Sequence, residues 1–258
     1  MIRNLPALAP AFVLAAGLAA APAFSFEINA MSEDEQAAFG DAVRAYLLEN
    51  PEVIMEAVAE LEKKQAAAQT ANDSALVVTN HDEIFNDGVS YIDGNPDGDV
   101  TFVEFVDYKC GYCRKAFPEL KALLEADGNI RIIYKEFPIL GPESDLASRF
   151  AISAQIIGGD EAYGPLHDAL MTMRANVTED SLASVADELG LDSAAILAGM
   201  SDPQVVKIID ANHDLASRLQ ITGTPTFVAG EQMIRGYVPL DGMTQIVAEL
   251  REAQAKAQ

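Results

Sequence analysis

Two cysteines, Cys110 and Cys113, are the only cysteines in the 258-residue chain, and they are separated by a Gly-Tyr pair. They follow a β-branched and aromatic run, residues 100–106, and precede a helical pattern over residues 114–126. In the first turn of a helix, side chains three residues apart are about 5–6 Å apart, which permits a disulfide. The unpaired N–H groups there stabilise a thiolate. This spacing predicts dithiol–disulfide chemistry, with Cys110 attacking and Cys113 resolving.

Other uses of the two sulfurs stay open at this stage. A structural disulfide closing so short a loop would stabilise the fold by only roughly 2 kcal/mol. Zinc needs further ligands, and the three histidines lie far away in sequence. Copper(I) needs only two thiolates, so Cys110 and Cys113 would also serve a copper-binding or copper-tolerance protein. A redox-independent oligomeric chaperone with an incidental disulfide is a further alternative. No other metal and no cofactor is expected.

Glu104 is an acid in the middle of the apolar strand, six residues before Cys110. Burial would raise the pKa of its carboxyl group. We expect Glu104 to accept and return the proton of Cys113 during exchange. The competing interpretation is a glutamate at a position that faces the edge of the sheet.

The run from Val103 to Cys113, Val-Glu-Phe-Val-Asp-Tyr-Lys-Cys-Gly-Tyr-Cys, is followed five residues later by Pro118. This pattern resembles the DsbA-like thiol-disulfide oxidoreductases. The resemblance implies a thioredoxin fold with a helical insertion and a cis-proline loop that faces the cysteine pair. Gly-Thr-Pro-Thr-Phe at residues 223–227 matches that loop. The resemblance implies that Pro225 is cis and that the backbone beside Thr224 pairs with an extended client peptide.

Two departures from the DsbA pattern bear on the direction of exchange. Strongly oxidising members carry Pro-His between the cysteines, whereas this chain has Gly111 and Tyr112. Those oxidases usually have valine before the cis-proline, where this chain has Thr224. Both features are similar to the periplasmic disulfide isomerases, which implies isomerase or reductase character. Tyr112 would tune access to the pair and its potential.

The rest of the chain indicates an α/β fold that agrees with this resemblance. Residues 130–137 are typical of a strand, and residues 143–220 are helical in pattern. Residues 226–229 and 232–235 indicate a hairpin, and a terminal helix is expected over 240–253. We therefore expect a DsbA-like domain over residues 91–258, with its helical insertion at about 141–220.

Residues 24–90 are expected to form a helical arm. Ser32 and Glu35 fit a capping box, and Asn50 is expected to cap a second helix. Residues 72–73 and 86–88 are expected to interrupt the helical pattern. A heptad-like seam follows Asn50 and needs a partner to be buried; it comprises Ile54, Val58, Leu61, Gln65 and Ala68.

The arm also resembles the oligomerisation segment of ScsC-like proteins, DsbA-like proteins linked to copper tolerance and disulfide shuffling. The resemblance rests on residues 46–52, Tyr-Leu-Leu-Glu-Asn-Pro-Glu. It implies a homo-oligomer, a dimer or a trimer. The alternative is a helix that packs on its own domain.

Residues 1–23 have the features of a cleaved signal peptide: a short basic start, an apolar core and Ala-Pro-Ala before the expected cut. An uncleaved anchor is the alternative. Export predicts a periplasmic protein that acts on unfolded or misoxidised exported proteins and exchanges electrons with a membrane redox partner. The chain carries 40 acidic and 17 basic residues, a formal charge of −23, which argues against nucleic-acid binding.

Overall fold

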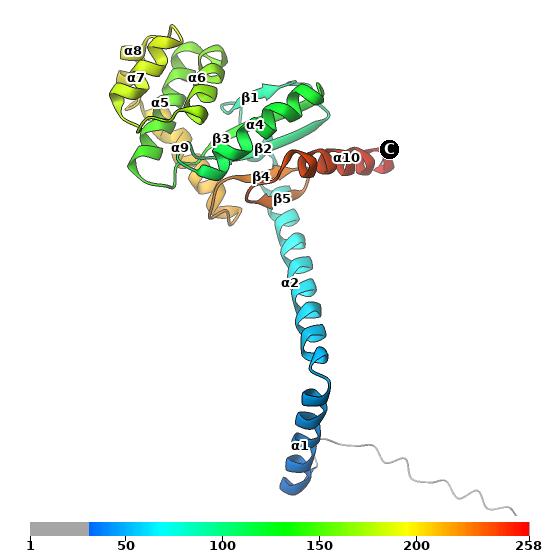
Figure 1. Cartoon of the computed structure of the whole chain (residues 1–258). Coiled ribbons are helices and arrows are strands. Elements are labelled where there is room, and N and C mark those ends of the chain that lie inside the picture. The colour runs from blue at the N-terminus through cyan, green and yellow to red at the C-terminus, as the bar shows by residue number, and fades with distance from the viewer. Residues whose placement is uncertain (1–30, 258) are drawn as a thin grey trace, which may run out of the picture. The chain divides into compact units, whose positions relative to one another are not determined.

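The computed structural model of the protein describes residues 31–257, so the expected signal peptide lies outside the described residues. The chain divides into two compact units, one up to Leu61 and one from Glu62 onward. Helix α1 (Glu33–Glu49) and the start of α2 (Glu52–Thr79) belong to the first unit (Figure 1). All later elements belong to the second unit.

In the first unit, the capping box at the start of α1 is confirmed. The Ser32 side chain accepts from the backbone N–H of Glu35, and the Glu35 carboxylate accepts from the backbone N–H of Ser32 at 2.8 Å. The expectation for Asn50 is wrong. Its side-chain amide donates to the carbonyl of Tyr46 at 2.9 Å, so Asn50 ends α1 rather than capping α2.

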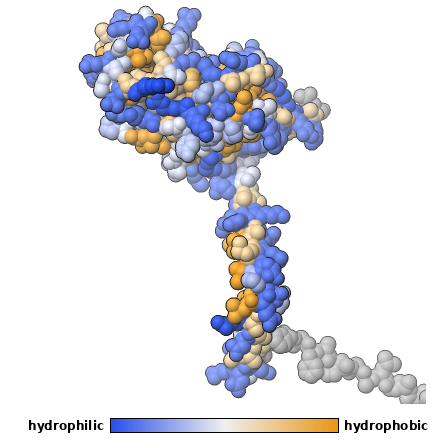
Figure 2. Space-filling model, in the orientation of Figure 1, coloured by the Kyte–Doolittle hydropathy of each residue, from blue (hydrophilic) through white to orange (hydrophobic). Residues whose placement is uncertain are grey.

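Apolar side chains gather along one side of this unit (Figure 2). Three members of the seam, Ile54, Val58 and Leu61, are 51%, 42% and 54% exposed. No buried residue occurs in α1, and in α2 the buried residues begin only at Asp73. Ile54, Val58 and Leu61 therefore form an apolar surface that the described residues of the first unit leave exposed.

The second unit is built on a five-stranded sheet in the order β1-β3-β2-β4-β5. Its strands are β1 (Tyr91–Gly94), β2 (Val100–Val106), β3 (Ile130–Glu136), β4 (Thr226–Ala229) and β5 (Gln232–Arg235). The central pair β2–β3 is parallel, and the other pairs are antiparallel. Strand β1 was not predicted, because four residues beside a turn carry too little periodicity to be distinguished from that turn.

Helices cover both faces of the sheet (Figure 1). Side chains of β2 alternate, so that Phe102 and Val106 enter one apolar cluster and Val103 and Phe105 enter another. The first cluster is covered by α4 (Gly111–Ala126), by helices of the insertion and by α10 (Leu240–Ala257). The second is covered by the end of α2, by α3 (His81–Phe85) and by the end of α9.

The helical insertion lies between β3 and β4, as expected. It consists of α5 (Pro142–Gly158), α6 (Asp160–Thr172), α7 (Glu179–Glu188), α8 (Ser193–Gly199) and α9 (Pro203–Arg218). Thr178 caps α7 through a capping box, and Pro203 occupies the first turn of α9. The thioredoxin fold with a helical insertion is therefore confirmed.

The junction between arm and domain differs from the sequence-based boundary. The interruption expected at residues 72–73 is wrong, because α2 continues to Thr79. Buried contacts hold its last turns: Asp73 is 5% exposed and pairs with Arg235, and Val77 is 1% exposed in the core. The interruption at residues 86–88 is confirmed. Residues 62–90, which the sequence assigned to the arm, thus lie in the same compact unit as the sheet.

Among the described residues, none of the helices combines the length and the apolar character needed to cross a membrane.

Candidate active site

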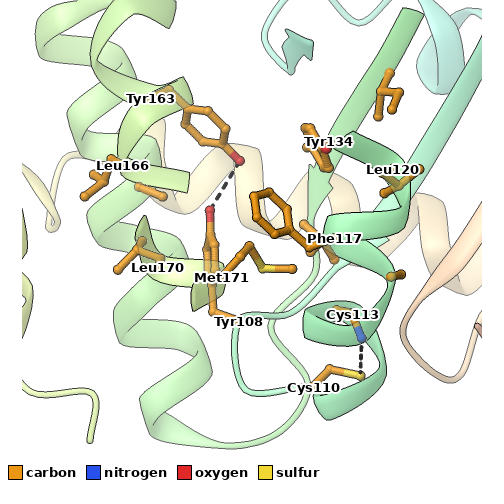
Figure 3. Close-up of a cluster of buried hydrophobic side chains, with 14 of the residues drawn as sticks. Tyr108, Cys110, Cys113, Phe117, Leu120, Tyr134, Tyr163, Leu166, Leu170 and Met171 are labelled. Carbon is orange, nitrogen blue, oxygen red and sulfur yellow. Dashed lines mark hydrogen bonds between the residues drawn. The ribbon is translucent and has the colours of Figure 1, made fainter. Parts of the chain in front are cut away.

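The cysteine pair begins α4, directly after the central strand β2. Cys110 is the N-cap residue, and its sulfur accepts from the backbone N–H of Cys113 at 3.4 Å. Both residues are free thiols, 6% and 0% exposed (Figure 3). The Cys110 sulfur also lies 3.1 Å from the carbonyl oxygen of Thr224, to which it donates when protonated. The pair is therefore held between a helix N-terminus and a loop that is distant in sequence.

The two thiols have opposite electrostatic environments. Hydrogen bonding from Cys113 lowers the pKa of Cys110 to about 5, helped by the Thr224 side chain and two backbone N–H groups, and partly opposed by burial. Burial raises the pKa of Cys113 well above its ordinary value, and the hydrogen bond to Cys110 and the charge of Glu104 add to this. At neutral pH Cys110 is therefore a thiolate and Cys113 a thiol.

Glu104 is fully buried on the central strand, so the edge-facing alternative is wrong. Burial raises the pKa of its carboxyl group well above the ordinary value, and the charges of Cys110 and Glu136 add to the shift. The Cys113 thiol is close enough to oppose it, although neither oxygen of Glu104 meets hydrogen-bond geometry. An acid this isolated from water can exchange a proton only with its immediate neighbours.

The peptide bond between Thr224 and Pro225 is cis, as the resemblance implied. Two hydrogen bonds hold the cis-proline loop, residues 223–227. The Pro225 carbonyl accepts from the backbone N–H of Gly236 at 2.9 Å, and the Thr226 hydroxyl donates to the Gly223 carbonyl at 2.8 Å. The structure therefore brings Cys110, Cys113, Glu104 and the cis-proline loop together.

Tyr112 is 63% exposed at the start of α4, and its ring lies beside Tyr237, with centroids 6.4 Å apart. The Lys115 ammonium lies over the Tyr237 ring at 4.0 Å, and the Tyr237 hydroxyl donates to Glu119 at 2.6 Å. Tyr237 was not predicted from the sequence, because it follows β5 and only the fold brings it beside Tyr112.

Asp107 was also missed. Its buried carboxylate accepts from the backbone N–H groups of Lys109 and Ile139, both at 2.8 Å, and of Leu140 at 3.1 Å. Its backbone carbonyl accepts from the N–H of Cys110 at 3.0 Å. Asp107 thus fixes the active-site loop, residues 107–110, and its place directly after a buried strand was the available signal.

The described residues contain no group of three or more histidine, cysteine and acidic side chains arranged to hold a metal ion. His167 lies beside Tyr108, with 2.9 Å between its Nδ1 and the tyrosine hydroxyl. A zinc site combining the cysteines with a histidine therefore has no support in this part of the chain.

Comparison with known proteins agrees with this geometry. Residues 101–248 match the DSBA-like thioredoxin domain family, and residues 35–68 match the copper resistance protein ScsC N-terminal domain. A thioredoxin-like oxidoreductase from Silicibacter pomeroyi is 40% identical, with a TM-score of 0.62 over 66% of this chain and 97% of that one. A linker-deletion variant of Proteus mirabilis ScsC is 26% identical, with a TM-score of 0.66 over 87% of this chain and 98% of that one.

A curated relative, the Na⁺/H⁺ antiporter NhaA 1 of Salinispora arenicola, is 26% identical over 159 residues, which are 61% of this chain. The chain spans about a quarter of that protein's length, since the match covers 24% of it. The family match covers more than half of the chain and includes the cysteine pair, Glu104 and the cis-proline loop. The chain therefore belongs to the family of DSBA-like thioredoxin domains.

Proposed function

We propose that this chain catalyses dithiol–disulfide exchange in exported client proteins, with Cys110 as the attacking thiolate. The observation that carries this proposal is the contrast between the two thiols. The pKa of Cys110 is lowered to about 5, whereas that of the buried Cys113 is raised. The Cys110 sulfur is thus a nucleophile at neutral pH, whereas the Cys113 sulfur stays protonated until the mixed disulfide has formed.

In the reducing direction, the Cys110 thiolate attacks one sulfur of a client disulfide, and the other client sulfur leaves as a thiolate. The Glu104 carboxylate then takes the proton of Cys113, and the new thiolate attacks the Cys110 sulfur. The second client sulfur leaves, the protein's pair becomes a disulfide, and two electrons have passed to the client. Because burial raises its pKa, the Glu104 carboxylate is a stronger base than an exposed carboxylate, which favours uptake of this proton.

We assign Thr224, Pro225 and Tyr112 to client binding. The Thr224 carbonyl lies within hydrogen-bond distance of the Cys110 sulfur, so backbone pairing at this loop would bring a client cysteine to the nucleophile. Tyr112 lies two residues after Cys110, and its exposed ring offers an apolar surface to a client.

We further propose an isomerase or reductase role performed by an oligomer, a dimer or a trimer. The Gly-Tyr pair and Thr224 support the first part. The exposed seam residues Ile54, Val58 and Leu61 and the match to the ScsC N-terminal domain support the second. Several sites on one assembly raise the effective concentration of thiolate around a bound client, which favours reshuffling.

The apolar segment within residues 1–23 supports export to the periplasm. The clients would then be unfolded or misoxidised exported proteins, and a membrane protein would return the pair to its working redox state. Exchange of this kind needs no cofactor, because the sulfurs themselves carry the electrons.

Reactivation of a scrambled-disulfide substrate tests the function. We expect the reduced protein to restore native pairing, Cys110→Ser to be inactive, and Cys113→Ser to accumulate mixed disulfides. Equal reactivation by wild type and Cys110→Ser would overturn the proposal. A glutathione titration tests the isomerase character: a potential close to about −120 mV, the value of the strongest oxidant, would contradict it.

A second candidate, copper(I) binding by Cys110 and Cys113, is favoured by the match of residues 35–68 to a copper resistance protein domain. The buried Cys113 opposes it, because its raised thiol pKa disfavours a second thiolate. Competition between the reduced protein and a copper(I) chelator tests this candidate function. Picomolar or tighter binding that is lost in Cys110→Ser would support copper(I) binding as the function, and micromolar binding would reject it.

A further inference from the structure

A buried carboxylate, Glu136, joins the active-site loop to the helical insertion. Glu136 is the last residue of β3 and is 3% exposed. One carboxylate oxygen accepts from the hydroxyls of Tyr108, at 2.7 Å, and Tyr163, at 2.5 Å. The other accepts from Ser148 at 2.6 Å, and the backbone carbonyl of Glu136 accepts from the Asn212 side chain at 3.0 Å. The active-site loop and helices α5, α6 and α9 therefore meet at this residue.

Tyr108 links this junction to the cysteines, because it lies two residues before Cys110 and is 2% exposed. Figure 3 shows the hydroxyls of Tyr108 and Tyr163 turned toward each other, one from the active-site loop and one from α6. Because the Tyr108 hydroxyl donates to Glu136, the proton between it and His167 must sit on Nδ1 of the histidine. The other ring nitrogen of His167 is buried without a partner.

No ion pair to Glu136 occurs among the residues that the structure describes, so hydroxyl groups stabilise its charge. Burial raises the pKa of Glu136 to about 7; the three hydroxyls oppose the shift, and the charge of Asp107 adds to it. Burial lowers the pKa of His167 to about 3, so this histidine is neutral and supplies no countercharge. The titratable groups facing the junction are Asp107 and Tyr108 from the loop, Glu104 from β2, and Tyr163 and His167 from α6.

We propose that Glu136 is a positioning residue for the cysteine pair: it holds the active-site loop on the helical insertion through Tyr108, and its ionisation favours opening of this junction. Opening hydrates the carboxylate, and its pKa then falls toward the ordinary 4.5. Between about pH 4.5 and 7 the open state therefore binds fewer protons than the closed state. Raising the pH through this window drives opening, and above about pH 7 the dependence ends.

Amide hydrogen exchange of the full reduced chain tests this between pH 5 and 8, after correction for intrinsic exchange rates. The opening constants of the loop amides (residues 107–110) and of the α6 amides should rise with pH by up to about tenfold per unit, and then level off near pH 7. The shift from about 7 to 4.5 limits the total change to about 300-fold. In Glu136→Gln this rise of the opening constants with pH should be lost.

Two variants separate positioning from a merely structural role. In Tyr108→Phe the α6 amides should keep the pH dependence, whereas the loop amides should lose it, because their link to the carboxylate is cut. Tyr163→Phe removes a hydroxyl that favours the ionised form, so the pH at which opening levels off should rise. Tyr163→Phe therefore also tests the role of the Glu136 carboxylate if Glu136→Gln does not fold.

Glu104→Gln is the matched control, since it removes another buried acid on the same face of the sheet and should leave the levelling near pH 7 in place. A flat wild-type profile, an unchanged slope in Glu136→Gln, or loop amides that still follow pH in Tyr108→Phe would each overturn the proposal. None of these readouts depends on thiol exchange, so a failure here is distinguishable from a failure of the proposed function.

Discussion

The sulfur of Cys110 lies 3.1 Å from the backbone carbonyl oxygen of Thr224, although 114 positions separate the two residues in the sequence. The contact joins the N-terminus of α4 to the cis-proline loop before β4. Whatever pairs with that loop is placed directly over the nucleophile.

The Cys110 thiol should titrate near pH 5 in the reduced protein, measured as thiolate absorbance or as the rate of alkylation against pH. Thr224→Val removes one hydrogen bond to the thiolate, so the midpoint should rise, by roughly half a unit to one unit. Thr226→Val is the control, because that hydroxyl bonds the Gly223 carbonyl and not the sulfur. A midpoint near 9 in the wild type would contradict the assignment of Cys110 as the thiolate.

This low pKa also has a stability consequence with a definite sign. The folded state holds Cys110 as a thiolate at pH values where the unfolded chain, with a pKa near 9, binds the proton. The contribution to the free energy of unfolding is complete above about pH 9 and is lost as the pH falls through about 5. Cys110→Ser should flatten the stability profile across this window, measured by urea unfolding of reduced protein.

Glu104 should make the free energy of unfolding fall as the pH rises, which is opposite to the effect of Cys110. Because burial raises its pKa, the folded protein keeps a proton that the unfolded chain loses near pH 4.5. This stabilisation is present at low pH and is lost as pH rises toward the folded-state pKa. Glu104→Gln should remove that loss, up to about 1.4 kcal/mol per pH unit, and should slow attack by Cys113 about 100-fold. Unfolding at pH 5 and 8 and stopped-flow resolution of a mixed disulfide measure the two effects.

The seam predicts an oligomer that a single charge can dissociate. Val58→Asp or Leu61→Asp places a carboxylate in the apolar surface and should yield monomers in light scattering, with reduced reactivation of scrambled substrate. Ala59→Asp adds the same charge at an exposed position outside the seam and should leave the mass unchanged. A wild-type monomer, or a seam variant that keeps its mass, would show that the seam does not mediate assembly.

Tyr237 should contribute to the binding of clients with an apolar or aromatic residue beside the cysteine. Tyr237→Ala removes the ring next to Tyr112 and should raise the KM for such a peptide several-fold, with little change for an alanine-flanked peptide. Tyr237→Phe keeps the ring and loses only the hydrogen bond to Glu119, so it is the matched control. Equal KM changes for both peptides would argue against a role in selectivity.

The catalytic strand, the start of α4, the hairpin and the insertion were predictable, because each has a local signal. A β-branched run marked β2, a C-x-x-C marked the helix N-terminus, and Pro203 marked the start of α9. Burial of Glu104 also followed from its apolar neighbours. These features depend on residues that are close in sequence, where propensity and periodicity carry the information.

The predictions that were wrong, and the residue that was missed, share a different cause. Residues 72–73 resemble a helix stop, yet the ion pair of Asp73 with Arg235 holds them in α2. Asn50 has the composition of an N-cap, but its side chain turns back to Tyr46. Tyr237 reaches the site only through the fold. In each case a contact that the local pattern does not contain decides the outcome.

The complete burial of Cys113 allows the reduced protein to be labelled selectively at Cys110. A maleimide or iodoacetamide reagent reaches the reactive Cys110, whereas Cys113 has neither accessible surface nor thiolate character at neutral pH. A fluorophore, spin label or affinity tag can therefore be placed on one atom of the native chain without any substitution. Because that atom is the nucleophile, the attached probe reports directly from the place where a client would sit.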